Sequence, residues 1–246
     1  MSATKERVDF SRFLVHLTKD SEQKKAKDIL LEIYEDETIE ARNHHCLFGP
    51  LLKNGNYTSV MTKKFNTVCF TETPLNEINK IARYIPGRSV KLAPYGLVFW
   101  RDLMIEDGAS QAIYINSKGT DIKDYLIAQF KEKFSHSKSY KNFQQSEPWH
   151  NEAINYYSLI NIISDTYDFS WEREWRFCQD FHFKRRKVAA IIASNPADFE
   201  KYSQTILSEG AFKTLKYTPI IDPIWGYEEM VEEMSHKLWS IRNSRN

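Results

Sequence analysis

The segment 172–176, Glu-Arg-Glu-Trp-Arg, carries the side chains whose types and spacing are best suited to chemistry. Side chains two residues apart on a strand share a face, so Glu172, Glu174 and Arg176 are predicted to line one face. One carboxylate of such a pair can stay ionised beside a cationic centre, while a neighbour whose pKa is raised by repulsion orients or deprotonates a nucleophile. The same charges on an exposed edge strand would be ordinary surface, although Trp171 and Trp175 argue against a fully wet edge.

A second candidate is His16, which lies in an otherwise apolar, β-like run at residues 13–17 and is followed by Thr18. An imidazole in such a run is either a structural group satisfied by its neighbours or a hydrogen-bonding partner for the hydroxyls of a sugar. The spacing leaves both interpretations open.

A third candidate is the hydroxyl pair of Thr71 and Thr73, which would share a face if the strand at 67–71 continued. Two hydroxyls on one face could hold a polar ligand or orient Glu174. Because Pro74 follows, Thr73 is equally well explained as the N-cap of a helix. Thr71 is therefore the stronger ligand candidate of the two.

No metal site is expected from the cluster His44-His45-Cys46, because adjacent side chains on a strand point to opposite faces and no partner with metal-ligand spacing exists. The other cysteines, Cys69 and Cys178, are distant in sequence and form no CxxC, which fits a reducing compartment. Glycine-rich phosphate loops and a GxSxG nucleophile motif do not occur either.

The charge balance of the chain limits the classes of partner that it can bind. Lys and Arg number 34 and Asp and Glu 33, so the net charge of +1 argues against a uniformly basic nucleic-acid binder. The densest basic run, residues 184–187, is either a solvated loop or a contact for a phosphate backbone. With no apolar run of about 20 residues and a polar N-terminus, the chain is expected to be cytoplasmic, with no membrane partner.

The apolar patterns predict one α+β domain over residues 1–246, without repeats or linkers. Strands are expected at 13–17, 67–71, 95–100, 111–115, 172–177, 188–193 and 215–217. Helices are expected after caps at Asp20, Thr73, Asp121 and Asn195, the last closing at Gly210, and at 151–163. Residues 42–64 and 135–150 are expected to be irregular. An amphipathic helix at about 227–242 would pack on the domain or serve a partner.

The order of these motifs resembles the DarT-like and AbiGi-like abortive-infection toxins and the broader DUF2971-type phage-defence proteins. The resemblance spans about residues 10 to 180 and lies in His16-Leu17-Thr18, in the run from Val68 to Leu75, in Tyr95-Gly96-Leu97-Val98-Phe99 and in the segment 172–176. It implies an ADP-ribosyltransferase-like fold, in which two mostly antiparallel sheets split around an NAD cleft and helices flank them.

The resemblance also implies site residues and a reaction. Glu174 matches the catalytic position and Glu172 its accessory position, and the cofactor-binding positions would be His16, Thr18, Thr71 and Tyr95. The substrates would be NAD and an acceptor, either nucleic acid or protein, and an antitoxin protein could be a partner. Breaking the bond between nicotinamide and ribose passes through an oxocarbenium-like sugar, which a fixed carboxylate stabilises.

Two other functions compete with this toxin activity. The chain could be a non-catalytic module on the same scaffold that senses a phage component or a nucleotide, or that acts as an antitoxin partner. It could also be a Mg²⁺-dependent nuclease built from scattered acids and histidines, although no PD-ExK or HNH-like arrangement is present. Growth arrest on expression, relieved by Glu174→Ala, would favour the toxin.

Overall fold

The computed structural model describes residues 11–42, 44–55, 57–82, 91–134, 150–165 and 168–243. The chain forms two compact units, each assembled from several stretches of sequence. Unit 1 comprises Met1–Thr38, Phe70–Asp107 and His182–Asn246, and unit 2 comprises Ile39–Cys69 and Gly108–Phe181. No helix within the described ranges is both long and apolar enough to cross a bilayer.

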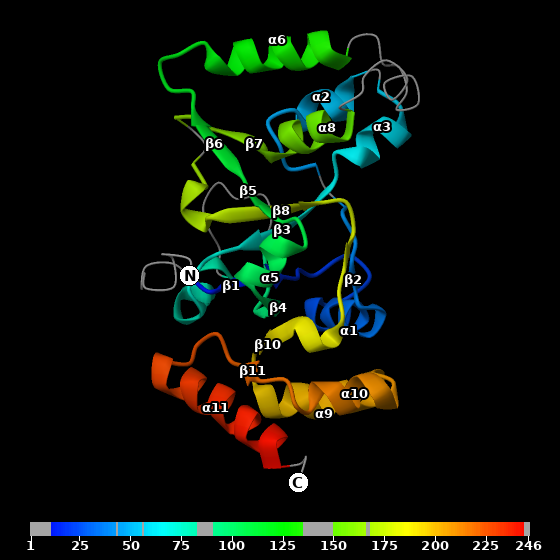
Figure 1. Cartoon of the computed structure of the whole chain (residues 1–246), viewed down its shortest axis with the longest axis vertical. Coiled ribbons are helices and arrows are strands. Elements are labelled where there is room, and N and C mark those ends of the chain that lie inside the picture. The colour runs from blue at the N-terminus through cyan, green and yellow to red at the C-terminus, as the bar shows by residue number, and fades with distance from the viewer. Residues whose placement is uncertain are drawn as a thin grey trace. The chain divides into compact units, whose positions relative to one another are not determined.

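Unit 1 is built on a sheet in which most neighbouring strands are antiparallel. The order is β11 (Ile220–Ile221), β10 (Val188–Ala193), β4 (Tyr95–Trp100), β1 (Phe13–Leu17) and then β3 (Thr67–Thr71), whose last two residues belong to this unit (Figure 1). Among these described strands, β10 and β11 run parallel and the other neighbouring pairs run antiparallel. This arrangement confirms the prediction of a mixed α+β fold with a mostly antiparallel sheet.

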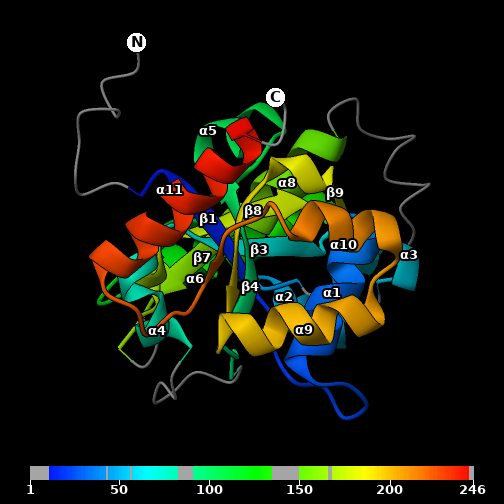
Figure 2. The same ribbon diagram turned by 90° about the horizontal axis from the view of Figure 1, so that it is seen from below.

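Helices cover both faces of the unit 1 sheet, which explains why strands such as β10 carry apolar side chains on both faces. α11 (Tyr227–Asn243) lies on one face and α9 (Pro196–Ile206) on the other (Figure 2). Met230 of α11 is buried in a core cluster with Val15 and Val98, so the C-terminal helix packs on the sheet. Other helical segments of this unit are α1 (Ala26–Asp36), η2 (Leu75–Glu77), α4 (Ile78–Ile81), α5 (Arg101–Glu106), η4 (Arg185–Lys187) and α10 (Glu209–Leu215).

The centre of this sheet depends on a close approach at Gly96. Gly96 pairs with Leu17 of β1 and with Ile192 of β10. A Cβ at this position would lie 2.4 Å from the carbonyl oxygen of His16, well inside contact distance. Only glycine therefore lets β4 approach β1 this closely beside the candidate His16.

Unit 2 is a second α+β assembly with its own ring-rich core. β5 (Ser110–Gln111) pairs antiparallel with β8 (Glu174–Cys178), and β6 (Ile113–Asn116) pairs parallel with β7 (Ile160–Ile163). Phe130 lies at the centre of its core, stacked on Phe48 at 4.4 Å between ring centroids. The helical segments are α2 (Gly49–Asn54), α3 (Ser59–Lys64), α6 (Ile122–Phe134), α8 (His150–Leu159) and η3 (Ser170–Glu172). Two short strands, β2 (Thr38–Ile39) and β9 (Phe181–His182), form a separate two-stranded sheet.

Several predicted elements are confirmed. The strands expected at 13–17, 67–71, 95–100 and 188–193 have the bounds of β1, β3, β4 and β10, and the helix capped by Asn195 is α9. The helix expected after Asp121 is α6, and the strand expected at 111–115 is interrupted at Ala112 into β5 and β6. Most of the loop expected at 135–150 lies outside the described residues.

The prediction that residues 42–64 are irregular is wrong, because the short helices α2 and α3 form there. The dipeptide Gly49-Pro50 is typical of a turn, but the proline lies in the first turn of α2. The N–H groups of a first turn have no partner within the helix, so the missing N–H of proline does not weaken the helix there. Leu52 and Met61 are buried in the unit 2 core. Packing therefore stabilises helices that are too short to form on their own.

The helix predicted at 151–163 and the strand predicted at 215–217 are also wrong. α8 ends at Leu159, and the following isoleucine-rich run Ile160–Ile163 forms β7 because its β-branched side chains favour a strand. Leu215 is the last, buried residue of α10. Gly210 lies inside that helix rather than closing α9.

Two of the predicted helix caps are wrong. α1 begins at Ala26, and Asp20 accepts the Ala26 N–H at 2.9 Å from outside the helix instead of serving as its N-cap. The Thr73 hydroxyl bonds the Thr71 hydroxyl at 2.9 Å, and η2 begins at Leu75 without a side-chain cap. Short polar side chains take either role, which is why their spacing alone did not separate them.

Candidate active site

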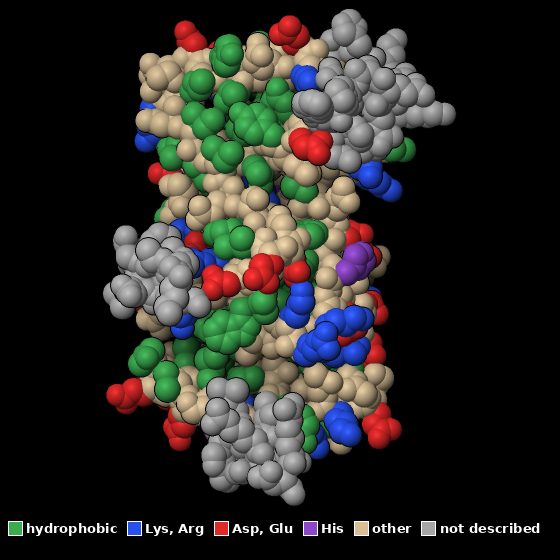
Figure 3. Space-filling view, in the orientation of Figure 1, with side chains coloured by type: hydrophobic (Ala, Val, Ile, Leu, Met, Phe, Trp, Pro, Cys, Tyr) green, Lys and Arg blue, Asp and Glu red, His purple; other side chains and the backbone are tan. Residues whose placement is uncertain are grey.

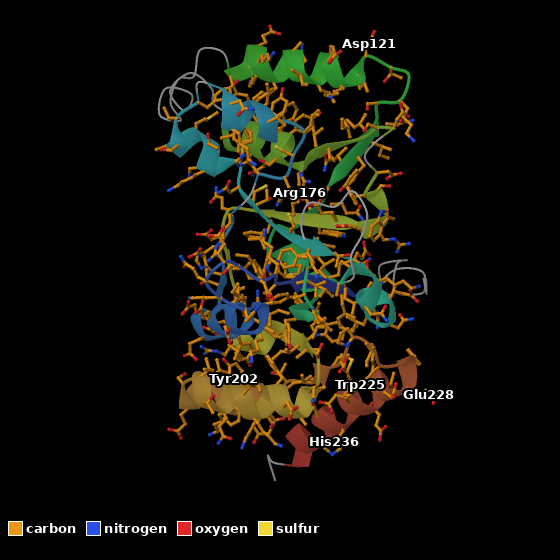
Figure 4. The ribbon with its side chains drawn as sticks, turned by 180° about the vertical axis from the view of Figure 1, so that it is seen from behind. Asp121, Arg176, Tyr202, Trp225, Glu228 and His236 are labelled. Atoms are coloured by element: carbon orange, nitrogen blue, oxygen red, sulfur yellow. The ribbon has the colours of Figure 1, made fainter. Side chains whose placement is uncertain are left out.

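Glu174 and Arg176 form a buried ion pair on one face of β8 in unit 2, as their spacing predicts. Arg176 Nε donates to Glu174 Oε1 at 3.0 Å and Nη2 donates to Oε2 at 2.9 Å, so the pairing is bidentate. Arg176 Nη1 donates to the carbonyl oxygen of Ser158 at 2.5 Å. The Arg176 side chain is fully buried and that of Glu174 is 13% exposed. Figure 4 labels Arg176 on its strand.

Two further groups complete the surroundings of the Glu174 carboxylate. The Tyr114 hydroxyl, on β6, donates to Oε2 at 3.0 Å, and the Cys69 thiol, on β3, donates a hydrogen bond to the same carboxylate. A carboxylate offers about four lone-pair sites, and these donors match them. We call Glu174, Arg176, Tyr114 and Cys69 the Glu174 site. A ligand hydroxyl that bonds this carboxylate must displace one donor, and the thiol is the weakest.

The Glu174 site keeps its carboxylate ionised. Burial alone would raise the pKa of Glu174, but the Arg176 charge and the hydrogen bonds from Arg176, Cys69 and Tyr114 outweigh burial and lower that pKa below its ordinary value. Burial and the Glu174 charge raise the pKa of the Cys69 thiol far above its usual range. The thiol therefore acts as a hydrogen-bond donor and not as a thiolate.

All three cysteines of the chain belong to unit 2 and lie within the electrostatic influence of Arg176. Their distance in sequence gave no sign of this clustering. Burial raises the pKa of Cys46, and it raises the pKa of Cys178 to about 11. None of the three cysteines is in a disulfide, and their thiols are protonated near neutral pH, so none of them is an activated nucleophile.

Glu172 does not share a strand face with Glu174, and that part of the sequence prediction is wrong. Residues Ser170–Glu172 form the 3-10 turn η3, and Arg173 takes a left-handed conformation with φ of 47° before β8 begins at Glu174. The alternating charges of this segment resemble the periodicity of a strand, but the left-handed conformation of Arg173 prevents a strand from starting before Glu174. The accessory catalytic role of Glu172 stays a prediction.

In unit 1, the strand pairing places His16 and Thr71 on opposite faces of the sheet. Val15 of β1 is directly opposite Thr71 of β3, so these two share a face. His16 lies on the other face, where its ring contacts Phe70 edge-on at 5.7 Å between centroids. The pairing therefore does not bring the imidazole and the Thr71 hydroxyl to one surface.

The remaining candidates for NAD binding also lie in unit 1. Thr18 is buried, and its hydroxyl is close to the carbonyl oxygens of Ala26 at 2.9 Å and Tyr95 at 3.1 Å. The Tyr95 ring is half-buried, and burial with the charges of Asp222 and Asp20 raises the pKa of its phenol. The backbone contacts of Thr18 give it a structural role, while the binding roles of His16 and Tyr95 stay predictions.

The acid between the two threonines, Glu72, is not presented to a ligand. Its side chain is fully buried and accepts from Arg101 Nη1 at 2.8 Å, forming an ion pair in the core of unit 1. The sequence gives no sign of this partner, which follows β4 far along the chain. Glu72, which follows β3, therefore has a structural role in this core.

The basic run at 184–187 is largely paired within unit 1. Lys184 and Arg185 both bond Glu37, and Lys187 Nζ lies 2.6 Å from Asp107 Oδ2. Figure 3 shows both basic and acidic side chains on the described part of the face that it draws. These pairings favour the structural interpretation of the run over a phosphate contact.

Within the described ranges, no group of three or more His, Cys, Asp or Glu side chains is arranged to hold a metal ion. Of the cluster that first suggested one, Cys46 is buried in the unit 2 core and His44 bonds Asn66.

We expect Tyr114→Phe to lower the free energy of unfolding by about 1 kcal/mol, because Glu174 Oε2 loses one of its donors. Urea denaturation at pH 7 measures this change. Tyr125→Phe is the control, since that tyrosine lies on α6 of the same unit and is 59% exposed. Equal stability of the two variants would contradict the role given to the Tyr114 hydroxyl.

No family model, no curated protein and no solved structure matches this chain.

Proposed function

We propose that this chain is an NAD-dependent ADP-ribosyltransferase, a toxin of a phage-defence or toxin–antitoxin system, that modifies nucleic acid or protein. The observation that carries the proposal is the Glu174 carboxylate, which is kept ionised and fixed in orientation by Arg176, Tyr114 and Cys69. The motif order described above and the mostly antiparallel α+β fold support the same activity.

The reaction requires a fixed anion at a developing cation. In ADP-ribosyl transfer the bond between the nicotinamide nitrogen and ribose C1′ breaks, and its electron pair neutralises the charge on the nicotinamide ring. The ribosyl cation is then attacked by a nucleophilic oxygen or nitrogen of the acceptor, which loses its proton to a base or to water. A carboxylate whose orientation is already fixed stabilises that cation without reorganising.

In this proposal Glu174 is the anion and Glu172 orients the acceptor. Because the four donors of its own chain match the lone-pair sites of Glu174, a ribose hydroxyl would replace the Cys69 thiol, the weakest of these donors. His16 and Tyr95 keep the NAD-binding roles that the resemblance implies, whereas the Thr18 hydroxyl is bonded to the backbone and Thr71 lies on the sheet face opposite His16.

Transfer of a radioactive label tests the proposal. Purified protein is incubated with NAD labelled in its adenylate phosphate and with cell extract, and acid-insoluble radioactivity is digested separately with nuclease and with protease. We expect labelled product with wild-type protein, and the digestion identifies the acceptor class. Absence of label with wild-type protein, together with unchanged free nicotinamide, would overturn the proposal.

A second candidate is a non-catalytic module on the same scaffold, one that senses a phage component or acts as an antitoxin. The observation that favours it is the saturation of Glu174 by donors of its own chain, since a buried ion pair of this kind is also how a structural site is built. Expression in a bacterial host separates the two candidates. The enzyme arrests growth and depends on Glu174, whereas the module leaves growth and NAD content unchanged.

A further inference from the structure

A pocket of about 440 Å³ lies in unit 2, next to the short helices α2 and α3. Its volume falls within the range of about 300–1,000 Å³ that small-molecule sites occupy. The described residues that line it include three cations and a histidine but no carboxylate. They are Arg42, His44, Leu52, Lys53, Gly55, Tyr57, Ser59, Thr62, Lys63 and Asn66. We call this the basic pocket.

The cations of the basic pocket are largely free to meet an anion. Lys53 and Lys63 occupy the last turns of α2 and α3, are exposed, and form no ion pair with a carboxylate in the described part of the chain. Arg42 is paired with Glu40 at 2.9 Å, but their side chains are 69% and 62% exposed. An exposed pair of this kind is weak and exchanges readily for another anion.

The histidine of the basic pocket has an unmet hydrogen-bonding group. Asn66 Nδ2 donates to the carbonyl of Ala41 at 3.0 Å, so its Oδ1 faces His44 Nδ1 at 3.2 Å and accepts the proton there. The other ring nitrogen, Nε2, is buried and has no partner among the described residues. Leaving such a group unsatisfied is costly. Because Nδ1 carries the proton, Nε2 is an acceptor, and its partner would have to be a donor such as a ribose hydroxyl or a base N–H, not a phosphate oxygen.

An aromatic ring and two hydroxyls complete the lining. A Cβ at Gly55 would lie 2.7 Å from the Tyr57 ring, so the absence of a side chain there lets the ring lie against the backbone. Ser59 and Thr62 of α3 add hydroxyl groups. Cations and hydroxyls suit phosphate oxygens, and a tyrosine ring beside them offers a surface on which a base can stack.

We propose that the basic pocket binds the phosphate group of a nucleotide, with Arg42, Lys53 and Lys63 contacting the phosphate and Tyr57 contacting the base. The ligand is either a free nucleotide or the 5′-phosphorylated end of a strand, since both present the same group. This site is separate from the Glu174 site and does not require the chain to transfer ADP-ribose.

Fluorescence anisotropy tests the site with two probes, a fluorescent adenosine triphosphate and a dye-labelled oligonucleotide carrying a 5′-phosphate. We expect saturable binding of at least one probe, competed by inorganic phosphate. Lys53→Ala with Lys63→Ala should weaken this binding by at least about tenfold and reduce its dependence on salt. Since both lysines are exposed, the double variant should fold normally.

The control is Lys123→Ala with Lys131→Ala, which removes the same charge from two exposed positions on α6 of the same unit. Its affinity should stay within about twofold of the wild-type value. Which probe binds identifies the source of the phosphate. Lack of saturable binding of both probes, or an equal loss of affinity in the two double variants, would overturn the proposal.

Discussion

Arg176→Met should lower the free energy of unfolding at pH 7 by about 3–5 kcal/mol. The substitution removes the guanidinium that bonds both oxygens of Glu174 and the carbonyl of Ser158. The Glu174 carboxylate then stays ionised and almost fully buried without a counter-charge. An uncompensated buried charge of this kind strongly destabilises the folded state. Urea denaturation of the purified variant measures the loss.

The control for this result is Arg186→Met, which removes the same charge from an exposed position and should change stability by less than about 0.5 kcal/mol. Combining Arg176→Met with Glu174→Gln removes the orphaned charge, and we expect the double variant to be more stable than Arg176→Met alone. A loss below about 1 kcal/mol for Arg176→Met would show that the pair is solvated in the folded protein.

Glu174→Gln should reduce the rate of ADP-ribosyl transfer by about 10²–10³-fold, because the neutral amide cannot stabilise a ribosyl cation. The rate is measured as nicotinamide release and as label transferred from NAD, at a temperature where circular dichroism shows the variant to be folded. The check that the variant is folded is needed because the substitution also leaves Arg176 without its anion, which lowers stability.

Glu152→Gln serves as the control for the rate, since that side chain is exposed on α8 of the same unit and should leave transfer unchanged. Equal transfer rates for the wild-type protein and Glu174→Gln would remove Glu174 from the reaction. Equal growth inhibition by the two proteins in cells would lead to the same conclusion.

The sequence predicts the strands of unit 1 well because their signal is local. Runs such as Leu97-Val98-Phe99 are apolar and favour a strand at every position, so the strand can be predicted without knowing what packs against it. Helices α2 and α3 depend instead on the burial of Leu52 and Met61, which is a property of the folded core. The unit boundary leaves no composition signal, because the chain passes between the units after Thr38, Cys69, Asp107 and Phe181.

The same holds for the candidate site: contacts between residues close in sequence are predicted, and contacts between distant residues are not. Spacing predicts that Glu174 and Arg176 share a strand face, which is confirmed. Tyr114 and Cys69 come from strands distant in sequence, and only the alternation of apolar neighbours around Tyr114 hints that it lies on a strand. Glu172 was misplaced because the left-handed conformation of Arg173, a non-glycine residue, has no signature in composition.

The ionisation of Glu174 also links this site to stability at acid pH. Because its pKa is lower in the folded protein than in the unfolded chain, the carboxylate contributes stability that is fully present above the ordinary glutamate pKa. That contribution is lost as the pH falls through the lowered pKa, since protonation then breaks the pairing with Arg176. Arg176→Met reverses this dependence, because burial then raises the pKa of the unpaired acid.

The most direct test of the account is the pKa of Glu174 itself, measured by NMR from the side-chain carboxyl carbon in protein labelled at glutamate. The resonance is assigned by its absence in Glu174→Gln. We expect a titration midpoint below the ordinary glutamate value of about 4.3, as an anion held by Arg176, Tyr114 and Cys69 requires. A midpoint above that value would mean that burial affects the pKa of Glu174 more than the ion pair with Arg176 does. Glu174 would then not be the fixed anion that the proposed reaction needs.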